Sequence, residues 1–282
     1  MAWTCGACTY FYLLILALAA PSVRSLSGNR HNMMSFRHNT RSFVCISTSS
    51  SGGNGLRFGR SLAKAMQMQT DVSVSCDLLL ATTEDVASVT MLDAIFEHTQ
   101  GWEEQGQIQG ATYWKHETGT YLWRIHQSFL NADDLDKQWE ASTGIRPSGL
   151  LFLSRHAAAS GNPSLTVHPI GNPNASAEPR SGGKAGVLPP PHPATAALFR
   201  GLSARARAAG PAVAGVFGVS LEATHHGPLC AAPAAFLEVG STEEHWGSRP
   251  AARVWAATLA AHFGWRRTAA EEDGSPVAEG GG

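Results

Sequence analysis

Residues 149–156 read GLLFLSRH, an apolar run that ends in three polar residues. The hydrophobic residues Leu150 to Leu153 are uninterrupted, which is typical of a central strand covered on both faces. Ser154, Arg155 and His156 follow at the point where such a strand would leave the core. The stretch therefore predicts a buried strand with polar side chains at its carboxyl end.

Strand and helix patterns alternate on both sides of this stretch. Strands are predicted at 72–83, 119–127, 164–172, 216–228 and 234–242, and helices at 84–99, 133–143, 194–210 and 241–263. Most of the Gly/Pro-rich stretch 169–194 is expected to be a loop. Such alternation favours an α/β fold in which helices flank a largely parallel sheet.

Local signals mark several helix ends. Asp85 lies near the start of its helix, where a negative charge favours the helix dipole. Gly144 is expected to close the helix at 133–143. Ser241 with Glu244 three residues later has the pattern of a capping box, and Pro250 indicates that the main helix begins afresh at that point.

Polar side chains also fall near the ends of the other predicted strands. They are His168 in one strand, Glu222, Thr224, His225 and His226 in a second, and Glu238 in a third. In open α/β sheets, ligands bind in the crevice beyond the carboxyl ends of the strands. We therefore expect these side chains, with His156, to converge on one site.

Histidines together with carboxylates suit a zinc site, in which a carboxylate is either a ligand or a partner that holds a ring N–H. A metal with an open coordination position would activate water for attack on an ester. Without a metal, the same side chains could act as general base and oxyanion donor. Both alternatives stay open at this point.

Charge and cysteine content divide the 282-residue chain. Residues 1–70 carry seven of the 21 basic residues and no Asp or Glu, which leaves 14 basic against 22 acidic residues in the remainder. That acidic balance excludes non-specific coating by nucleic acid, which needs clustered basic residues. Beyond the first 70 residues, Cys76 and Cys230 are the remaining cysteines, so a disulfide framework is not indicated.

The first 70 residues are expected to be a targeting leader or a disordered extension. An apolar run at 10–20 has the length of a secretory signal, and the Arg- and Ser-rich, acid-free segment after it resembles an organelle transit peptide. Together they resemble the two-part leaders of plastid proteins, with a cytoplasmic location as the alternative. We expect a domain at 71–264 that is incomplete at its C-terminal side, a disordered tail at 265–282, and no membrane span in the mature form.

Four motifs in this order resemble the D-aminoacyl-tRNA deacylases of archaea and plants. They are FLSRHAAASGNPSLTVHPIGN at 152–172, SGGKAG at 181–186, VSLEATHHGP at 219–228 and FLEVGSTEEHW at 236–246. The resemblance covers roughly residues 72–262. It implies hydrolysis of the ester that joins a D-amino acid to the 3′ end of tRNA, with zinc as cofactor. It also implies a fold similar to nucleoside phosphorylases and peptidyl-tRNA hydrolase.

The chain departs from the family pattern at its end, because a GGGHYAP motif and a later Gly-His pair are missing. The alternative hypothesis is therefore a catalytically inactive relative that binds tRNA or zinc. No protein partner is predicted.

With this resemblance, we assign roles to nine residues. The predicted metal ligands are His156, His168 and Glu238. The predicted catalytic residues are Glu222, Thr224, His225 and His226. Arg155 and Lys184 are the predicted contacts to the tRNA terminus.

Overall fold

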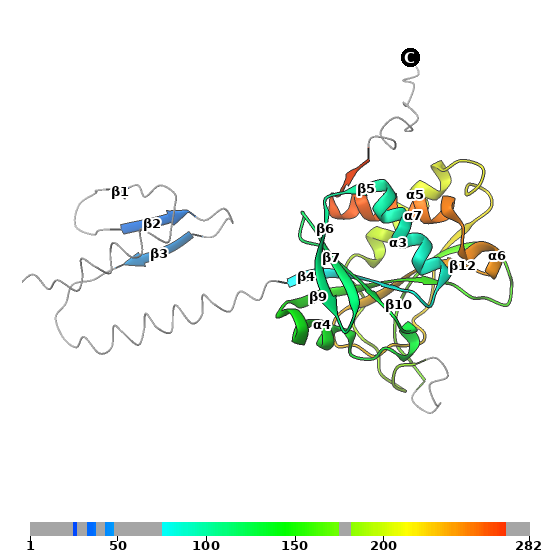
Figure 1. Ribbon diagram of the computed structural model, residues 1–282, viewed down its shortest axis with the longest axis horizontal. Coiled ribbons are helices and arrows are strands. Elements are labelled where there is room, and N and C mark those ends of the chain that lie inside the picture. The colour runs from blue at the N-terminus through cyan, green and yellow to red at the C-terminus, as the bar shows by residue number, and fades with distance from the viewer. Residues whose placement is uncertain (1–24, 27–32, 38–42, 48–74, 175–181, 269–282) are drawn as a thin grey trace, which may run out of the picture. The chain divides into compact units, whose positions relative to one another are not determined.

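The computed structural model divides into two compact units, Met1–Asp71 and Val72–Gly282. The structure describes residues 75–174 and 182–268 of the second unit (Figure 1). In the first unit it describes the backbone of the strands β1 (Ser25–Leu26), β2 (Met33–Arg37) and β3 (Phe43–Ser47), which pair in an antiparallel sheet. The rest of the predicted leader lies outside the described residues, so its targeting role stays a prediction.

An eight-stranded mixed sheet forms the centre of the second unit. Its strands are β4 (Ser75–Thr82), β6 (Trp102–Ile108), β7 (Ala111–His116), β8 (Tyr121–Ile125), β9 (Arg146–Arg155), β10 (Ser164–Pro169), β11 (Gly218–Leu221) and β12 (Ala234–Gly240). They lie in the order β11-β10-β12-β9-β4-β8-β7-β6. Strands β12, β9, β4 and β8 run parallel, which confirms the predicted α/β fold. Strand β10 runs antiparallel to β12.

Helices cover both faces of this sheet (Figure 1). They are α3 (Val86–His98), α4 (Leu135–Thr143), α5 (Thr195–Ala208), the short α6 (Glu243–Trp246) and α7 (Arg249–Phe263). The first hydrophobic cluster packs α3, α5 and α7 against Leu151 and Leu153 of β9. The second packs α4 and its surroundings against Leu150 and Phe152. Because successive strand residues face opposite sides, the apolar run of β9 supplies both cores, as predicted.

The helix ends agree with the sequence signals at three points and differ at one. Asp85 is the N-cap of α3, Gly144 closes α4 in a left-handed conformation, and α7 begins afresh with Pro250 in its first turn. The predicted capping box at Ser241 is wrong. Ser241 is buried and its hydroxyl bonds to the Asn162 carbonyl, because the chain is still leaving β12 there.

Two further features differ from the sequence prediction. Strands β6 and β7 form a hairpin whose turn residues Gln109 and Gly110 both have positive φ, where Asn-Gly would be the usual signal. The predicted tail from 265 begins too early, because Trp265 is 4% exposed and β13 (Arg266–Arg267) pairs with β5 (Thr99–Gln100). Residues 269–282 lie outside the described residues.

Cys76 and Cys230 are both buried free thiols, which fits the absence of a disulfide framework. None of the helices among the described residues has the length and hydrophobicity that a bilayer crossing requires.

Asp85 joins the start of α3 to the end of β9, and the candidate site begins directly after that strand. Its Oδ1 accepts hydrogen bonds from the N–H groups of Ala87 and Ser88. Its Oδ2 accepts from the Arg155 N–H at 2.8 Å and from the Ser154 hydroxyl at 3.0 Å. One buried carboxylate therefore fixes both the helix and the strand end.

We expect Asp85→Ala to lower the free energy of unfolding by about 2–4 kcal/mol, because it removes an N-cap and leaves buried donors unpaired. Urea denaturation of the full chain measures this loss. The matched control is Asp93→Ala on the exposed face of the same helix, which should change stability little. Equal effects of the two substitutions would contradict the bridging role of Asp85.

Candidate active site

The candidate site lies on the sheet face that bears the second hydrophobic cluster, where β9, β12 and β10 adjoin the segment after β11. In the antiparallel register, Thr166 of β10 lies opposite Glu238 of β12, and His168 lies opposite Phe236. His168 is therefore level with the middle of β12. The predicted gathering of all the histidines at the carboxyl rim of parallel strands is wrong in this respect. The site instead extends from His156, at the carboxyl end of β9, inward along the sheet face that bears the second hydrophobic cluster.

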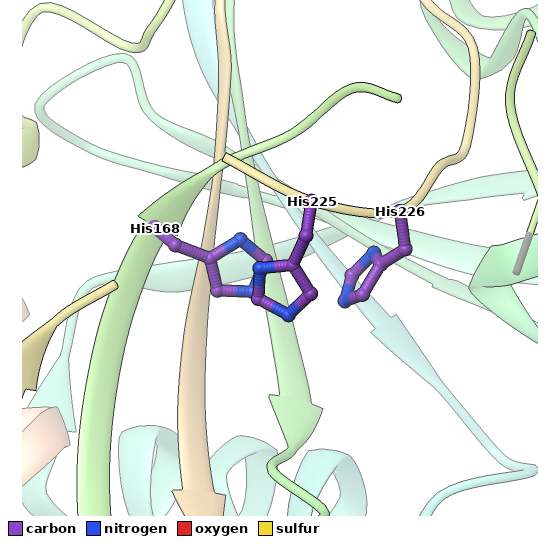
Figure 2. Close-up of side chains that lie close together, drawn as sticks. All are labelled: His168, His225 and His226. Atoms are coloured by element: carbon purple, nitrogen blue, oxygen red, sulfur yellow. The ribbon is translucent and has the colours of Figure 1, made fainter. Parts of the chain in front are cut away.

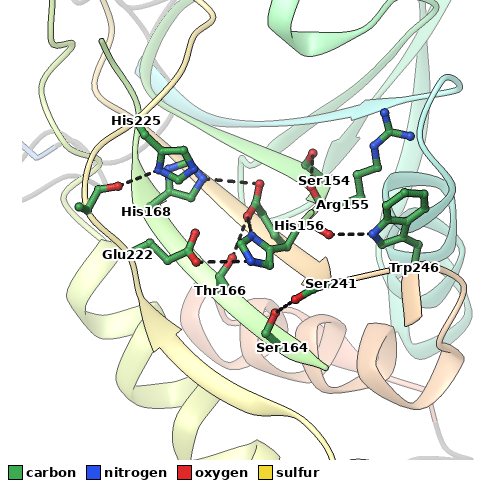
Figure 3. Close-up of polar contacts among 12 residues, drawn as sticks. Ser154, Arg155, His156, Ser164, Thr166, His168, Glu222, His225, Ser241 and Trp246 are labelled. Atoms are coloured by element: carbon green, nitrogen blue, oxygen red, sulfur yellow. Dashed lines mark hydrogen bonds and ion pairs between the residues drawn. The ribbon is translucent and has the colours of Figure 1, made fainter. Parts of the chain in front are cut away.

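A first group of side chains surrounds the buried Glu238 carboxylate (Figure 3). Glu238 Oε2 accepts a hydrogen bond from Thr166 Oγ1 at 2.7 Å and lies 3.2 Å from His156 Nδ1. The other ring nitrogen of His156, Nε2, lies 3.5 Å from Oε1 of Glu222. His156 is thus held between two carboxylates, one buried and one half-buried.

The electrostatics of this group keep the buried carboxylate ionised and favour protonation of the histidines next to it. Burial by itself would raise the pKa of Glu238, but hydrogen bonds and charge from its histidine neighbours outweigh burial and lower that pKa to about 2. The hydrogen bond to Glu238 raises the pKa of His156. Burial opposes protonation of His168, yet the nearby Glu238 carboxylate outweighs it and raises the pKa of His168 as well. His156 and His168 can therefore carry a proton although both side chains are largely buried.

A second group consists of His168, His225 and His226, which face one another (Figure 2). One nitrogen of each ring lies within 4.8 Å of one nitrogen of the other two. Each Nδ1 lies within hydrogen-bond distance of a backbone carbonyl oxygen. These oxygens belong to Pro169 at 2.9 Å, Ala223 at 2.8 Å and Gly227 at 2.7 Å.

These hydrogen bonds fix the tautomers of the three rings. A carbonyl oxygen only accepts, so each Nδ1 carries a proton, and a ring in its neutral form presents a lone pair on Nε2. In His168 this Nε2 is buried and makes no hydrogen bond within the described residues, although Glu238 Oε1 lies 3.5 Å away. Three ring nitrogens of this kind form a donor set of the type that borderline metals prefer.

Ring stacking connects the second group to the core. Phe152 stacks on Phe236 at 4.7 Å between ring centroids, Phe236 on His168 at 5.4 Å, and His168 on His225 at 4.1 Å. The row runs from the buried centre of β9 to the exposed ring of His225. Burial of the neighbouring His226 lowers its pKa to about 4, so this ring is neutral at pH 7.

Backbone contacts hold the His225–His226 segment in place. The N–H of Gly171 donates to the His226 carbonyl at 2.7 Å. Gly227 lies against Gly182 and Gly183 so closely that a Cβ on Gly227 would come 2.2 Å from the Gly183 nitrogen. Gly182 and Gly183 therefore pack on the histidine segment by backbone, and the exposed Lys184 follows them directly in the chain.

The structure brings together six of the nine predicted residues and leaves three outside the two groups. The six are His156, His168, Glu222, His225, His226 and Glu238. Of the other three, Thr224 is half-buried and its hydroxyl makes no hydrogen bond in the described part of the chain. Lys184 is exposed. The guanidinium of Arg155 lies over the Trp246 ring, 4.9 Å from its centroid (Figure 3).

The predicted metal set of His156, His168 and Glu238 is divided between the two groups. Sequence reasoning also missed Thr166, which lies two residues before His168 and so shares its sheet face. Strand alternation could have identified it. Trp246 is the other omission. Its indole N–H donates to the His156 carbonyl at 2.7 Å, a contact between distant segments that no local pattern indicates.

Comparisons with known proteins give a consistent result. Residues 143–282 match the family model for D-aminoacyl-tRNA deacylase. A D-aminoacyl-tRNA deacylase of Arabidopsis thaliana is 39% identical over 181 residues, which cover 64% of this chain and 56% of the relative. One from Hyperthermus butylicus is 44% identical over 113 residues, or 39% of each chain.

A solved structure agrees with the sequence relatives. The crystal structure of a conserved protein of unknown function is 29% identical, with a TM-score of 0.56, and the match covers 66% of this chain and 62% of that one. The chain thus spans a little over half the length of its Arabidopsis relative. The predicted likeness to nucleoside phosphorylases stays a prediction.

The low pKa of His226 predicts how stability depends on pH. The pKa of His226 falls from its ordinary 6.5 to about 4 on folding. The contribution of this ring to the free energy of unfolding is therefore complete above pH 6.5, and it is lost as the pH falls through about 4. In chelator-treated protein, we expect the stability difference between the wild type and His226→Asn to shrink over this range. Urea denaturation at several pH values measures it. His126→Asn, at an exposed histidine, is the matched control. A pH-independent difference for His226→Asn would contradict the assignment.

Proposed function

The chain belongs to the D-aminoacyl-tRNA deacylase family, and from this membership we propose that it hydrolyses the ester joining a D-amino acid to the 3′ end of tRNA. The products would be the free D-amino acid and tRNA. The observation that carries the proposal is the position of His156 between Glu222 and Glu238, directly beside three converging histidine rings. Ester hydrolysis needs groups that move protons next to groups that polarise a carbonyl.

The donor set of the second group fits zinc. We propose that His168, His225 and His226 hold the ion through Nε2, because each Nδ1 is already engaged by a backbone carbonyl. Such outer hydrogen bonds orient metal-binding imidazoles in known sites. The buried Nε2 of His168, which makes no hydrogen bond in the part of the chain that the structure describes, supports the same assignment. When bound, zinc would supply Lewis-acid polarisation of the ester carbonyl.

The first group provides the proton transfers. Water attacks the carbonyl carbon while the Glu222 carboxylate takes one of its protons. As the bond from this carbon to the ribose oxygen breaks, His156 donates its Nε2 proton to that oxygen. The 3.5 Å contact between His156 Nε2 and Glu222 Oε1 then returns the proton. Glu238 favours the protonated imidazole throughout, because it raises the pKa of His156.

Two further residues complete the proposal. The hydroxyl of Thr224, which has no hydrogen-bond partner among residues 75–174 and 182–268, is available to donate to the developing oxyanion, next to His225 in the chain. The exposed Lys184 is available for a charge-assisted contact with a phosphate of the tRNA end. Chirality would be read by shape, through a pocket that accepts the D side chain and clashes with the L side chain.

Hydrolysis of the two enantiomeric substrates tests the reaction. We expect the full chain to release D-tyrosine from D-Tyr-tRNA and to leave L-Tyr-tRNA intact. His156→Gln should lower the rate by about 10²-fold or more, since it removes the acid–base group. His126→Gln on the exposed surface is the control. Equal release from both substrates, or none from either, would contradict the proposal, and tRNA binding without turnover would favour an inactive relative.

Zinc content tests the ligand assignment independently of activity. We expect His225→Gln and His168→Gln to lose bound zinc during dialysis, because each removes one of three ligands. His156→Gln should retain the ion. Elemental analysis of the dialysed proteins measures this. Loss of zinc from His156→Gln alone would instead place the ion in the first group.

A further inference from the structure

Arg155 and Trp246 form a stacked pair at the end of β9, in which Arg155 is exposed and Trp246 is half-buried against the first hydrophobic cluster. The Arg155 guanidinium lies 4.9 Å from the centroid of the Trp246 ring. Within the described residues, it makes no hydrogen bond or ion pair with a carboxylate, so its N–H donors face solvent. An arginine that is stacked but otherwise unpaired presents a flat, positively charged surface.

This pair is fixed in position by hydrogen bonds at both ends. The Arg155 N–H donates to the buried Asp85 carboxylate at 2.8 Å, which anchors its backbone. The Trp246 indole N–H donates to the His156 carbonyl at 2.7 Å. Gly240 permits this approach, since a Cβ at that position would come 2.4 Å from the same carbonyl oxygen. The stacked surface is therefore joined directly to the residue that handles protons in the proposed reaction.

We propose that the Arg155–Trp246 pair binds the terminal base of the tRNA 3′ end, an inference that rests on the proposed deacylase function. The ester to be cleaved is on the ribose that carries this adenine, so the base must lie within one nucleotide of the reacting groups. Unpaired bases are recognised by stacking on aromatic rings and on guanidinium planes. The exposed guanidinium supplies such a plane near His156, the indole beneath it holds that plane in position, and its positive charge suits a polyanionic partner.

The location of the pair also explains how a single substrate can contact both the two histidine groups and the Arg155–Trp246 pair. Figure 3 shows Trp246 and Arg155 on one side of His156, with Glu222 and His225 on the other. A nucleotide whose ester lies among the histidines can therefore extend past the rim of β9 and place its base against the Arg155 guanidinium. The two groups hold the acyl end, and the pair holds the nucleoside end.

Two synthetic esters separate base binding from catalysis. One is the D-tyrosyl ester of adenosine, and the other is the same ester of a ribose that lacks the base. We expect Trp246→Leu and Arg155→Met to lower kcat/KM for the adenosine ester by about tenfold, the size of one lost stacking contact. The base-free ester should react as it does with the wild type. Arg200→Met, an exposed arginine on α5, is the matched control for loss of charge.

Each other outcome has a definite meaning. Equal losses on both esters would show that the pair only positions His156, and the base proposal would be wrong. Unchanged kinetics on both esters would place the base elsewhere. Trp246→Phe, which keeps a ring but lacks the N–H, should retain more of the preference for adenosine than Trp246→Leu.

Binding of uncharged RNA separates this proposal from the proposed reaction. We expect the wild type to bind a minihelix ending in CCA about tenfold more tightly than one with an abasic last residue, and Trp246→Leu to abolish the difference. If the wild type hydrolyses no ester but keeps this preference, the reaction is refuted and the base site stands. If the preference is absent, the base site is refuted whether or not hydrolysis occurs.

Discussion

The buried carboxylate of Glu238 is the interaction on which the rest of the site depends. Removing an ionised carboxylate from water is costly unless charged partners and hydrogen bonds compensate. Thr166, His156 and His168 provide that compensation from two other strands. The compensation requires β10 to lie antiparallel to β12 in the observed register, since a shift by one residue would turn Thr166 and His168 to the opposite face.

From this carboxylate the two groups extend in different directions with different chemistry. Toward the rim, the hydrogen bond to Glu238 and the charges of Glu238 and Glu222 raise the pKa of His156. Toward the segment after β11, His226 is neutral because burial disfavours its charge, and Nδ1 of each ring in that group is occupied by a backbone carbonyl. One site thus combines His156, whose protonation the carboxylates favour, with His226, whose neutral ring can donate a lone pair to a metal.

Asp85 and Trp246 connect the end of β9, beside the site, to the helices α3 and α6. Both contact the stretch from Ser154 to His156, one through a side chain at the N-terminus of α3 and the other through an indole from α6. Hydrogen bonds from both sides therefore hold the rim of β9 where the proposed nucleotide would cross it. A preorganised rim reduces the cost of ordering the substrate before the ester is cleaved.

The sequence by itself determined the class of fold, the central strand at 149–156 and the residue types of the site. These follow from local patterns, because an uninterrupted apolar run and polar strand ends are properties of neighbouring residues. Only the tertiary structure decided the direction of β10, the division of the ligands into two groups, and the contacts of Thr166 and Trp246. Those depend on which segments pair across more than 70 positions of the chain, and no local pattern encodes that pairing.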